Sequence, residues 1–453
     1  MKQWQEETLV QGLFDWIEAC PTAYHTVDQI RKALDRAGFV GLCESEPWTL
    51  RAGKRYYVTR NDSSVLAFRL PPHPEEATGY QVVAAHGDSP SFKLKADCEE
   101  VVLDHYTKLN VEKYGGMICS TWLDRPLSVA GRVMIRNEAG EIESRLVRVD
   151  RDLALIPNVA IHMNRNINDG FSFNPQVDML PLVGEKSTNS LKNQFASEIG
   201  VKEEQILAHD LFLYVRQRGC RWGVNEEYIS APHLDDLMCV YTALQAFLSV
   251  SVNCDVSCMP NSIPMLAVFD NEEVGSATRQ GASSSMIEDT VARIEHAIAG
   301  KNPDGRYCRM ANSMMLSADN AHAVHPNHPE YADAQNRPYM NGGIVVKCHA
   351  GQAYSTDAVS AALFSEICKR AEVPMQTFAN RSDMRGGSTL GNLAATRVPF
   401  LTVDIGLAQL AMHSAYETAG AKDLGYMARA CEVFYRSAVI SDGAGKYRLV
   451  QAD

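Results

Sequence analysis

Two adjacent acids, Glu272 and Glu273, follow directly after the apolar run at residues 263–269. Such a run is typical of a buried strand, and in an α/β sheet the residues beyond the carboxyl end of a strand face the ligand crevice. Neighbouring side chains on an extended chain point to different sides, so one acid can bind a metal while the other transfers a proton. Taken alone, the stretch is more typical of a charged surface turn.

Several other segments repeat this pattern and favour a metal site. His86 ends the apolar run at residues 82–85, and Asp88 follows two residues later. A neutral imidazole can bind a metal, and a nearby carboxylate can orient the ring. Three further candidates stand beside apolar segments: Asp235, Asp319 and His413. Each has an ordinary alternative, because a lone His is more often solvated or hydrogen-bonded than a ligand, and an Asp before a helix often caps it.

The candidate ligands form a set of two imidazoles and three carboxylates: His86, Asp235, Glu273, Asp319 and His413. This set suits two divalent ions that share one bridging carboxylate. Zinc accepts both His nitrogen and carboxylate oxygen and keeps an open position in catalytic sites, so zinc is the expected metal, with Mn or Co as alternatives. We therefore expect these residues to converge on one hydrolytic centre.

Five phrases of the sequence resemble those of the aspartyl aminopeptidase family, and each contains a candidate site residue: 86–90, 234–236, 269–276, 317–323 and 411–414. Similar flanking segments extend the resemblance over essentially the whole chain: 21–25, 53–61, 158–165, 342–347 and 381–391. Two positions depart from the family pattern. Gly87 stands where Thr is common, and Asp236 stands where Asn is common. The extra acid would raise the pKa of a neighbouring carboxylate or alter the metal preference.

The resemblance implies a cytosolic di-zinc aminopeptidase that prefers an N-terminal Asp or Glu. In the implied mechanism, a metal-bridging water loses its proton to a Glu and attacks the peptide carbonyl. The implied metal ligands are His86, Glu273, Asp319 and His413, with Asp235 as the bridging carboxylate. Glu272 would be the general base, and Asp88 would orient His86.

Three further residues have roles that the resemblance implies less directly. His162 is similar to a family His that reaches an active site across a subunit boundary and stabilises the oxyanion, although a His in a surface strand is equally typical. Lys347 and Arg381 lie in family-like segments and would bind an acidic substrate side chain. Surface charge is the ordinary explanation for either cation.

Composition excludes several classes of protein. The chain has 453 residues, which is ample for two domains, and its net charge of −12 argues against a nucleic-acid or anionic-membrane surface. We expect no membrane span, because there is no apolar run of about 18 residues, and no export, because acids occupy the place of a signal-peptide core. The 12 cysteines include no Cys-x-x-Cys pair, which predicts reduced thiols in the cytoplasm.

The predicted fold is a three-layer α/β/α catalytic domain that carries an inserted β-rich domain. The catalytic domain would comprise residues 1–92 and 223–453, where apolar strands and amphipathic helices alternate. The insertion would comprise residues 93–222, where alternating β-rich segments contain no candidate metal ligand. The resemblance implies that the insertion mediates subunit contacts in a large homo-oligomer, such as a dodecamer, that encloses its active sites.

Two rival functions remain open. A related di-metal carboxypeptidase or deacylase would use the same metal and base but would recognise a carboxylate instead of a free amine. A non-catalytic scaffold would keep the fold as a peptide-binding shell, and its sequence would lack the base or a ligand. This chain retains Glu272 and every proposed ligand, which favours an enzyme.

Overall fold

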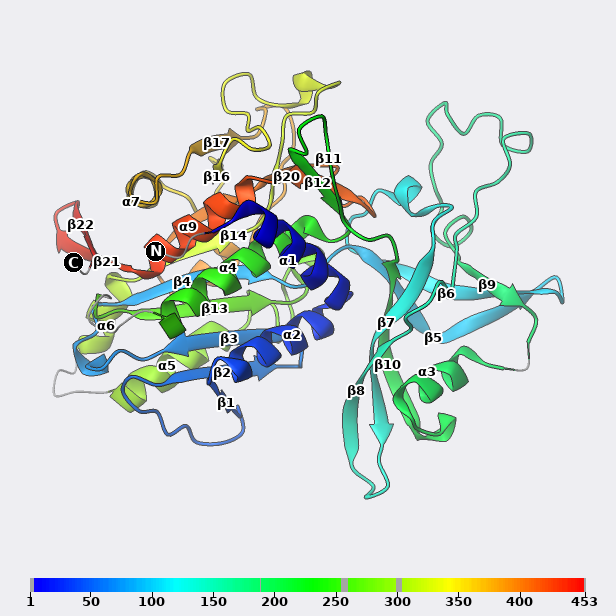
Figure 1. The fold of residues 1–453 in the computed structure, drawn as a ribbon, viewed down its shortest axis with the longest axis horizontal. Helices are drawn as coiled ribbons and strands as arrows, with labels where there is room; N and C mark the ends of the chain where they lie inside the picture. The colour runs from blue at the N-terminus through cyan, green and yellow to red at the C-terminus, as the bar shows by residue number, and fades with distance from the viewer. Residues whose placement is uncertain (1–3, 188, 254–259, 299–303, 452–453) are drawn as a thin grey trace.

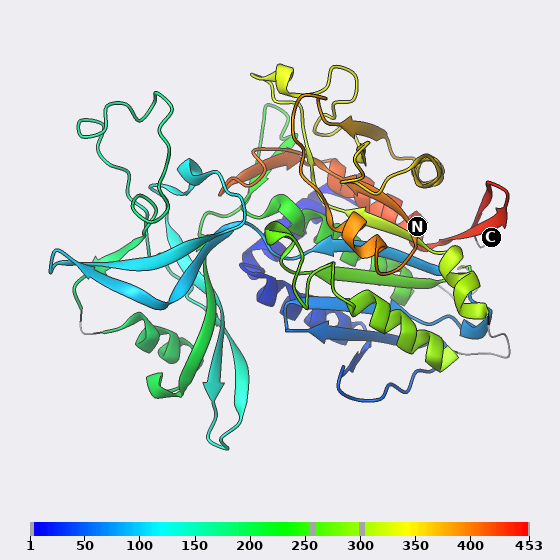
Figure 2. The same ribbon diagram turned by 180° about the vertical axis from the view of Figure 1, so that it is seen from behind.

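The structure is a computed structural model, which describes residues 4–187, 189–253, 260–298 and 304–451. The chain forms two lobes, each built on its own sheet (Figures 1 and 2). The larger lobe has a nine-stranded sheet in the order β1-β2-β3-β13-β4-β14-β18-β16-β17. The bounds of these strands are β1 Val40–Leu42, β2 Arg55–Arg60, β3 Ser64–Arg69, β4 Tyr80–His86, β13 Ile263–Phe269, β14 Met314–Ala318, β16 Ile344–Cys348, β17 Met375–Ala379 and β18 Leu401–Gly406.

Helices cover both faces of this sheet. One face is covered by α1 Glu6–Ala19, α2 Ala23–Arg36, α4 Leu234–Asn253, α7 Ala358–Arg370 and α9 Asp423–Tyr435. The other is covered by α5 Met286–Ile298, α6 Gly305–Ala311 and α8 Leu390–Ala395. Figures 1 and 2 show these two layers from opposite sides. The predicted three-layer α/β/α architecture is therefore confirmed.

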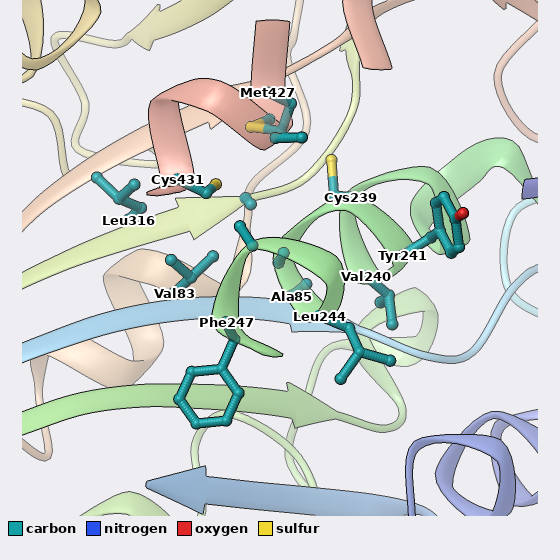
Figure 3. Packing of buried hydrophobic residues seen from close by; sticks show 14 of the residues in the cluster. Val83, Ala85, Cys239, Val240, Tyr241, Leu244, Phe247, Leu316, Met427 and Cys431 are labelled. Atoms are coloured by element: carbon teal, nitrogen blue, oxygen red, sulfur yellow. The ribbon is translucent and has the colours of Figure 1, made fainter. Parts of the chain in front are cut away.

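The apolar strand β4 shows why the central strands appear in the sequence as continuous hydrophobic runs. Val83 and Ala85 pack against the α4 side, whereas Val82 and Ala84 pack against the α5 side. Because both faces are buried, no polar alternation is left in the sequence. Figure 3 shows the α4 side of this packing, where α4 and α9 lie side by side against the sheet. Helix α1 also packs on α4. A helix enclosed in this way is apolar on all sides.

Helix α7 begins after a well-defined N-cap. Asp357 adopts an extended conformation as the N-cap, and its side chain accepts a hydrogen bond from the Ser360 amide. The Ser360 hydroxyl in turn receives the Asp357 amide at 3.0 Å, which completes a capping box. The helix therefore runs from Ala358 to Arg370.

The smaller lobe has a six-stranded sheet in the order β8-β7-β10-β5-β6-β9 and carries the α-helix α3 Leu191–Ile199. Its strands are β5 Ser91–Val102, β6 Tyr106–Tyr114, β7 Leu127–Arg136, β8 Ile142–Arg148, β9 Leu182–Glu185 and β10 Ile206–Val215. Phe92, Trp122 and Phe195 belong to its own hydrophobic core. The domain limits at 92/93 and 222/223 stay a prediction; the six strands of this sheet lie between Ser91 and Val215.

A five-stranded sheet, in the order β11-β12-β20-β19-β15, supports the edge of the larger lobe. Its strands are β11 Cys220–Trp222, β12 Tyr228–Ala231, β15 Ala321–His322, β19 Ala408–Leu410 and β20 Glu417–Gly420. The chain ends in a hairpin of β21 Ser437–Gly443 and β22 Lys446–Gln451. Across the described residues, no helix combines the length and the apolar character needed to cross a bilayer.

Candidate metal centre

Three neighbouring parallel strands deliver site residues to the same edge of the large sheet. In the register of β4 and β13, His86 lies opposite Phe269. In the register of β4 and β14, Ala84 lies opposite Ser317. The residues that follow these strands therefore emerge at one level, as the carboxyl ends of parallel strands do. They are Asp88, Glu272, Glu273 and Asp319.

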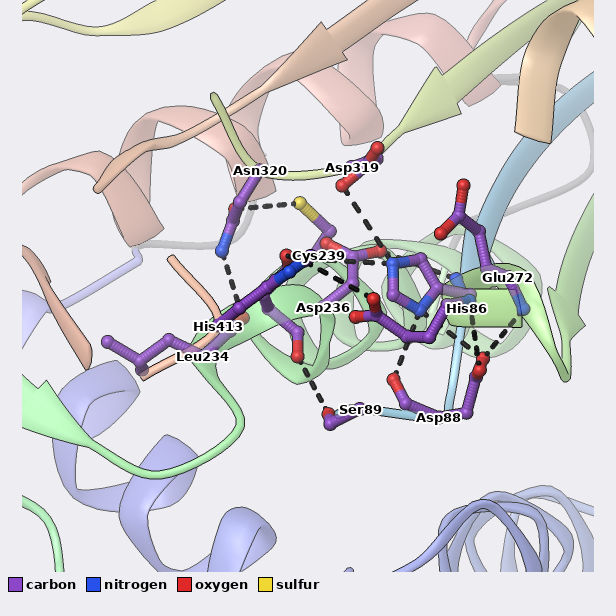
Figure 4. Close-up of polar contacts among 12 residues, drawn as sticks. His86, Asp88, Ser89, Leu234, Asp236, Cys239, Glu272, Asp319, Asn320 and His413 are labelled. Carbon is purple, nitrogen blue, oxygen red and sulfur yellow. Dashed lines mark hydrogen bonds and ion pairs between the residues drawn. The ribbon is translucent and has the colours of Figure 1, made fainter. Parts of the chain in front are cut away.

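The remaining two predicted ligands reach this edge from other elements. Asp235 stands at the start of α4, where its backbone is not helical (φ −83°, ψ 109°), and its side chain is buried. His413 lies in the loop between β19 and β20. Figure 4 shows His413 and His86 pointing toward the same group of carboxylates. The structure thus brings all five predicted ligands together.

The carboxylate of Asp235 lies between the two imidazoles. Its Oδ1 atom is 3.5 Å from His86 Nε2, and its Oδ2 atom is 3.5 Å from His413 Nε2. Asp319 Oδ1 lies 3.8 Å from His86 Nε2, and Glu273 Oε2 lies 3.3 Å from His413 Nε2. The potential ligand atoms form two groups, each within 4.8 Å, and both groups contain Asp235. This is the arrangement expected of a carboxylate shared between two metal positions.

Buried oxygen atoms without hydrogen bonds fit cations at this site. Asp235 Oδ1, Asp236 Oδ1 and Glu273 Oε1 have no hydrogen-bonding partner among the described residues. A buried carboxylate oxygen without a partner is costly, and a bound cation removes that cost. Nitrogen and oxygen ligands of this kind suit zinc.

The extra acid Asp236 belongs to the group around His86. Its Oδ2 atom accepts the His86 backbone amide at 3.3 Å. Burial raises the pKa of Asp236 well above its ordinary value. Burial therefore opposes the extra negative charge that the sequence suggests at this position.

The ring nitrogens of both histidines are oriented for metal binding. His86 Nδ1 lies 3.1 Å from the Asp88 carbonyl oxygen, and His413 Nδ1 lies 2.6 Å from the Gly116 carbonyl oxygen. When Nδ1 carries the proton and donates it to a carbonyl, Nε2 is left free to bind a metal. Burial alone would lower the pKa of His413, but Asp235 raises it to about 9, so a bound cation must displace a proton here.

The Asp88 carboxylate, whose Oδ1 atom lies 3.4 Å from His86 Nδ1, also contacts the residues after β13. Its orienting role stays a prediction. Its Oδ1 atom accepts the Glu272 amide and its Oδ2 atom accepts the Glu273 amide, each at 3.2 Å. Asp88 therefore fixes the turn that carries the proposed base and a ligand. Glu272 itself lies beside the ligands, and burial, reinforced by the neighbouring acids, raises its pKa to about 8.

The sequence did not single out Glu417, which joins two ligand-bearing segments. The buried Glu417 carboxylate accepts the Asp235 amide at 2.9 Å and the His413 amide at 2.7 Å. Gln409 and Asn320 extend this buried network, because Asn320 Nδ2 donates to Gln409 Oε1 at 2.9 Å. The only sequence signal was an acid four residues after His413, which is too common to carry a prediction.

A cavity of about 130 Å³ opens beside the ligands, and its lining includes Glu272, Asp319, Lys347, Tyr354 and Phe378. The Lys347 ammonium is buried and lies 3.2 Å from Asp319 Oδ2. Burial alone would lower the pKa of Lys347, but the surrounding acids raise it above its ordinary value, so the side chain stays charged.

Two predicted site residues lie outside this cavity in the single chain. Arg381 is on an exposed loop, where it forms an ion pair with Asp383 at 2.8 Å. His162 is exposed in the long segment between β8 and β9 of the smaller lobe. Their predicted roles in substrate binding and oxyanion stabilisation remain predictions.

Comparison with known proteins defines the class of enzyme. The profile of the aminopeptidase I zinc metalloprotease family (M18) matches residues 16–435, so the chain belongs to this family. The predicted membership of the aspartyl aminopeptidase family is thereby confirmed, and the protein is a metallo-aminopeptidase that hydrolyses peptide bonds.

Particular relatives cover almost the whole chain. The protein is 44% identical over 437 residues to a probable M18 family aminopeptidase 2 of Clostridium acetobutylicum, covering 95% of this chain and 99% of that protein. Its fold matches a chain from the Ape4 and Nbr1 complex with a TM-score of 0.91 and 33% identity, over 95% of this chain and 86% of that one. It also matches the S. cerevisiae mApe1 dodecamer with a TM-score of 0.83 and 28% identity, over 95% and 96%.

Proposed function

We propose that this protein is a di-metal aminopeptidase that removes N-terminal Asp or Glu from peptides. The observation that carries the proposal is the position of Asp235, whose two carboxylate oxygens each face one imidazole 3.5 Å away. Two zinc ions bound there would polarise the scissile carbonyl and acidify the attacking water. Mn or Co would supply the same chemistry.

Glu272 transfers the proton in this proposal. The side chain lines the cavity beside Asp235 and Asp319, and burial raises its pKa to about 8. A buried carboxylate beside a metal-bound water can both accept and return its proton. Glu272 therefore takes the proton of the attacking water and delivers it to the leaving amine. Asp88 Oδ1 accepts the backbone amide of Glu272 at 3.2 Å and so holds this residue in place.

The acidic surroundings explain why a free N-terminus is needed. A protonated or metal-directed α-amino group is attracted to the carboxylates that gather at the centre, whereas a blocked amine has no such interaction. The cavity beside the centre is small, at about 130 Å³, so it suits the side chain of one terminal residue. The family match favours an aminopeptidase over the carboxypeptidase or deacylase alternative.

Lys347 is the group that we expect to select acidic N-terminal residues. Replacing Lys347 with Met keeps the length of the stem and removes the charge, so kcat/KM for Asp and Glu substrates should fall about 10- to 100-fold, as expected for a charge-assisted hydrogen bond. Hydrolysis of a Leu substrate should change little. The measurement is kcat/KM for matched Asp, Glu and Leu peptides.

Arg381→Met is the matched control, because Arg381 is a cation outside the cavity lining. Zinc content must be measured in both variants, since Lys347 contacts Asp319 at 3.2 Å. A fall that is equal for Asp, Glu and Leu substrates, at full zinc content, would remove Lys347 as the selector.

We also propose that the chain works as a large homo-oligomer, such as a dodecamer, in the cytoplasm. Apolar side chains around His162 are exposed, with Val159 at 56% and Met163 at 84%, which suits a subunit contact that brings His162 to a neighbouring centre. The structurally similar mApe1 forms a dodecamer. The described cysteines are all free thiols, as expected of a reducing compartment.

A further inference from the structure

The smaller lobe reaches the catalytic centre through three consecutive residues at the end of β6. They are Tyr114, Gly115 and Gly116. We propose that this segment is a positioning element for the centre, and that the Tyr114 hydroxyl holds the turn that carries Glu272. This inference rests on the proposed function, because it assigns Tyr114 a role through the base.

The Tyr114 hydroxyl connects two parts of the catalytic lobe. It donates to Asp88 Oδ2 at 2.7 Å and accepts from Asn271 Nδ2 at 2.8 Å. Asp88 in turn accepts the amides of Glu272 and Glu273. Asn271 directly precedes Glu272 and has a left-handed backbone (φ 61°, ψ 24°). The hydroxyl therefore contacts both Asp88, which accepts the Glu272 amide, and Asn271, which precedes Glu272 in the chain.

Asn271 has fixed partners on its other side. Its Oδ1 atom accepts from Thr278 Oγ1 and from Gln280 Nε2, each at 2.8 Å. The remaining polar group of the amide, Nδ2, donates to Tyr114 Oη at 2.8 Å and to Asp270 Oδ1 at 3.2 Å. Loss of the hydroxyl would therefore take an acceptor from a side chain whose other bonds already set its orientation.

The ring of Tyr114 belongs to the smaller lobe. It packs edge-on against Phe212 of β10, with ring centroids 5.4 Å apart. The ring is fixed by the smaller lobe and the hydroxyl contacts the larger lobe. The packing of the smaller lobe therefore determines where the hydroxyl meets Asp88. Tyr114 is a positioning residue and not a catalytic one, since it does not line the cavity beside the ligands.

The two glycines make independent contacts with metal ligands. Gly115 has φ +80°, and a Cβ atom added there would lie 3.2 Å from Glu273 Cβ. The backbone can pass this close to the ligand because residue 115 has no side chain. Gly116 supplies the carbonyl oxygen that lies 2.6 Å from His413 Nδ1. The same segment thus borders the base turn, one carboxylate ligand and one imidazole ligand.

Tyr114→Phe tests the role of the hydroxyl, because it keeps the ring and its packing on Phe212. We expect kcat to fall about tenfold or more, since a hydrogen bond to a charged group is lost. KM, zinc content and melting temperature should stay close to those of the parent enzyme. Tyr214→Phe is the matched control: Tyr214 is also buried in the smaller lobe, and its hydroxyl donates to the Val149 carbonyl at 2.8 Å, away from the centre.

A double-mutant cycle separates positioning of the base from a general structural effect. If Tyr114 acts through Glu272, then Tyr114→Phe should have no further effect on the residual turnover of the Glu272→Gln enzyme. The proposal is overturned if Tyr114→Phe behaves like Tyr214→Phe, or if its loss of kcat persists undiminished in the Glu272→Gln background.

Failure of the proposed function gives a different pattern. A fully active Glu272→Gln enzyme would contradict the assignment of the base, and with it the route by which Tyr114 acts. An inactive Glu272→Gln enzyme beside an unchanged Tyr114→Phe enzyme would contradict the positioning role alone.

Discussion

Replacing Glu272 with Gln should lower kcat by about 10²- to 10⁴-fold, the usual contribution of a general base. Gln has nearly the same shape and can keep the backbone hydrogen bond from residue 272 to Asp88, but it cannot accept a proton from the attacking water. The five proposed metal ligands are untouched, so the variant should retain its zinc. The measurement is kcat for an Asp peptide together with zinc content.

Glu366→Gln serves as the control for this experiment. Glu366 is exposed on α7 and pairs only loosely with Lys369 at 3.8 Å, so the same chemical change there should leave turnover unchanged. Parent-level turnover in the Glu272→Gln enzyme would show that another group removes the proton. Loss of turnover accompanied by loss of zinc would show that Glu272 acts on the metal site instead of on the water.

The second large effect is expected at Asp235. Asp235→Asn keeps the size of the side chain and the backbone hydrogen bond to Glu417 at 2.9 Å, but it removes the charge that both ligand groups share. Changing even an outer partner of a metal ligand costs about 10- to 100-fold in metal affinity, so changing the shared ligand should cost more. We expect zinc to fall below two ions per chain and activity to be lost.

His413→Ala provides the comparison, because His413 belongs to only one of the two ligand groups. It should weaken one metal position and leave the His86 group occupied. Asp442→Asn, on the exposed hairpin of β21 and β22, controls for the loss of a carboxylate. Each variant is titrated with zinc, and mass spectrometry of the native protein gives the number of zinc ions bound per chain. Two tightly held ions in Asp235→Asn would rule out the bridging role.

The parts of the centre that the sequence predicted are those that follow from strand ends. The apolar runs before His86, Glu272 and Asp319 are buried on both faces, so each run was recognisable as a strand, and the polar residues at its end were candidates for the site. Parallel pairing then brings these ends to one edge. Local patterns were sufficient for these residues because the carboxyl ends of neighbouring parallel strands always lie close together in the sheet.

The supporting residues could not be predicted in the same way. Glu417 contacts an amide 182 positions away, and Tyr114 contacts a carboxylate across the junction of two lobes. Neither residue has a local pattern that distinguishes it from an ordinary acid or a core aromatic. Lys347 and Arg381 were similar candidates in the sequence, and only the fold shows that Lys347 alone of the two lines the cavity. Such contacts depend on tertiary packing.

The most direct test of the proposed function is hydrolysis of a panel of substrates by zinc-loaded enzyme, with and without a chelator. The panel contains peptides with N-terminal Asp, Glu, Leu and Lys and an acetyl-blocked Asp. We predict cleavage of the free-amine Asp and Glu peptides only, lost with chelator and restored by added zinc. Cleavage of the acetylated substrate alone, or turnover that survives complete removal of metal, would contradict a di-metal aminopeptidase.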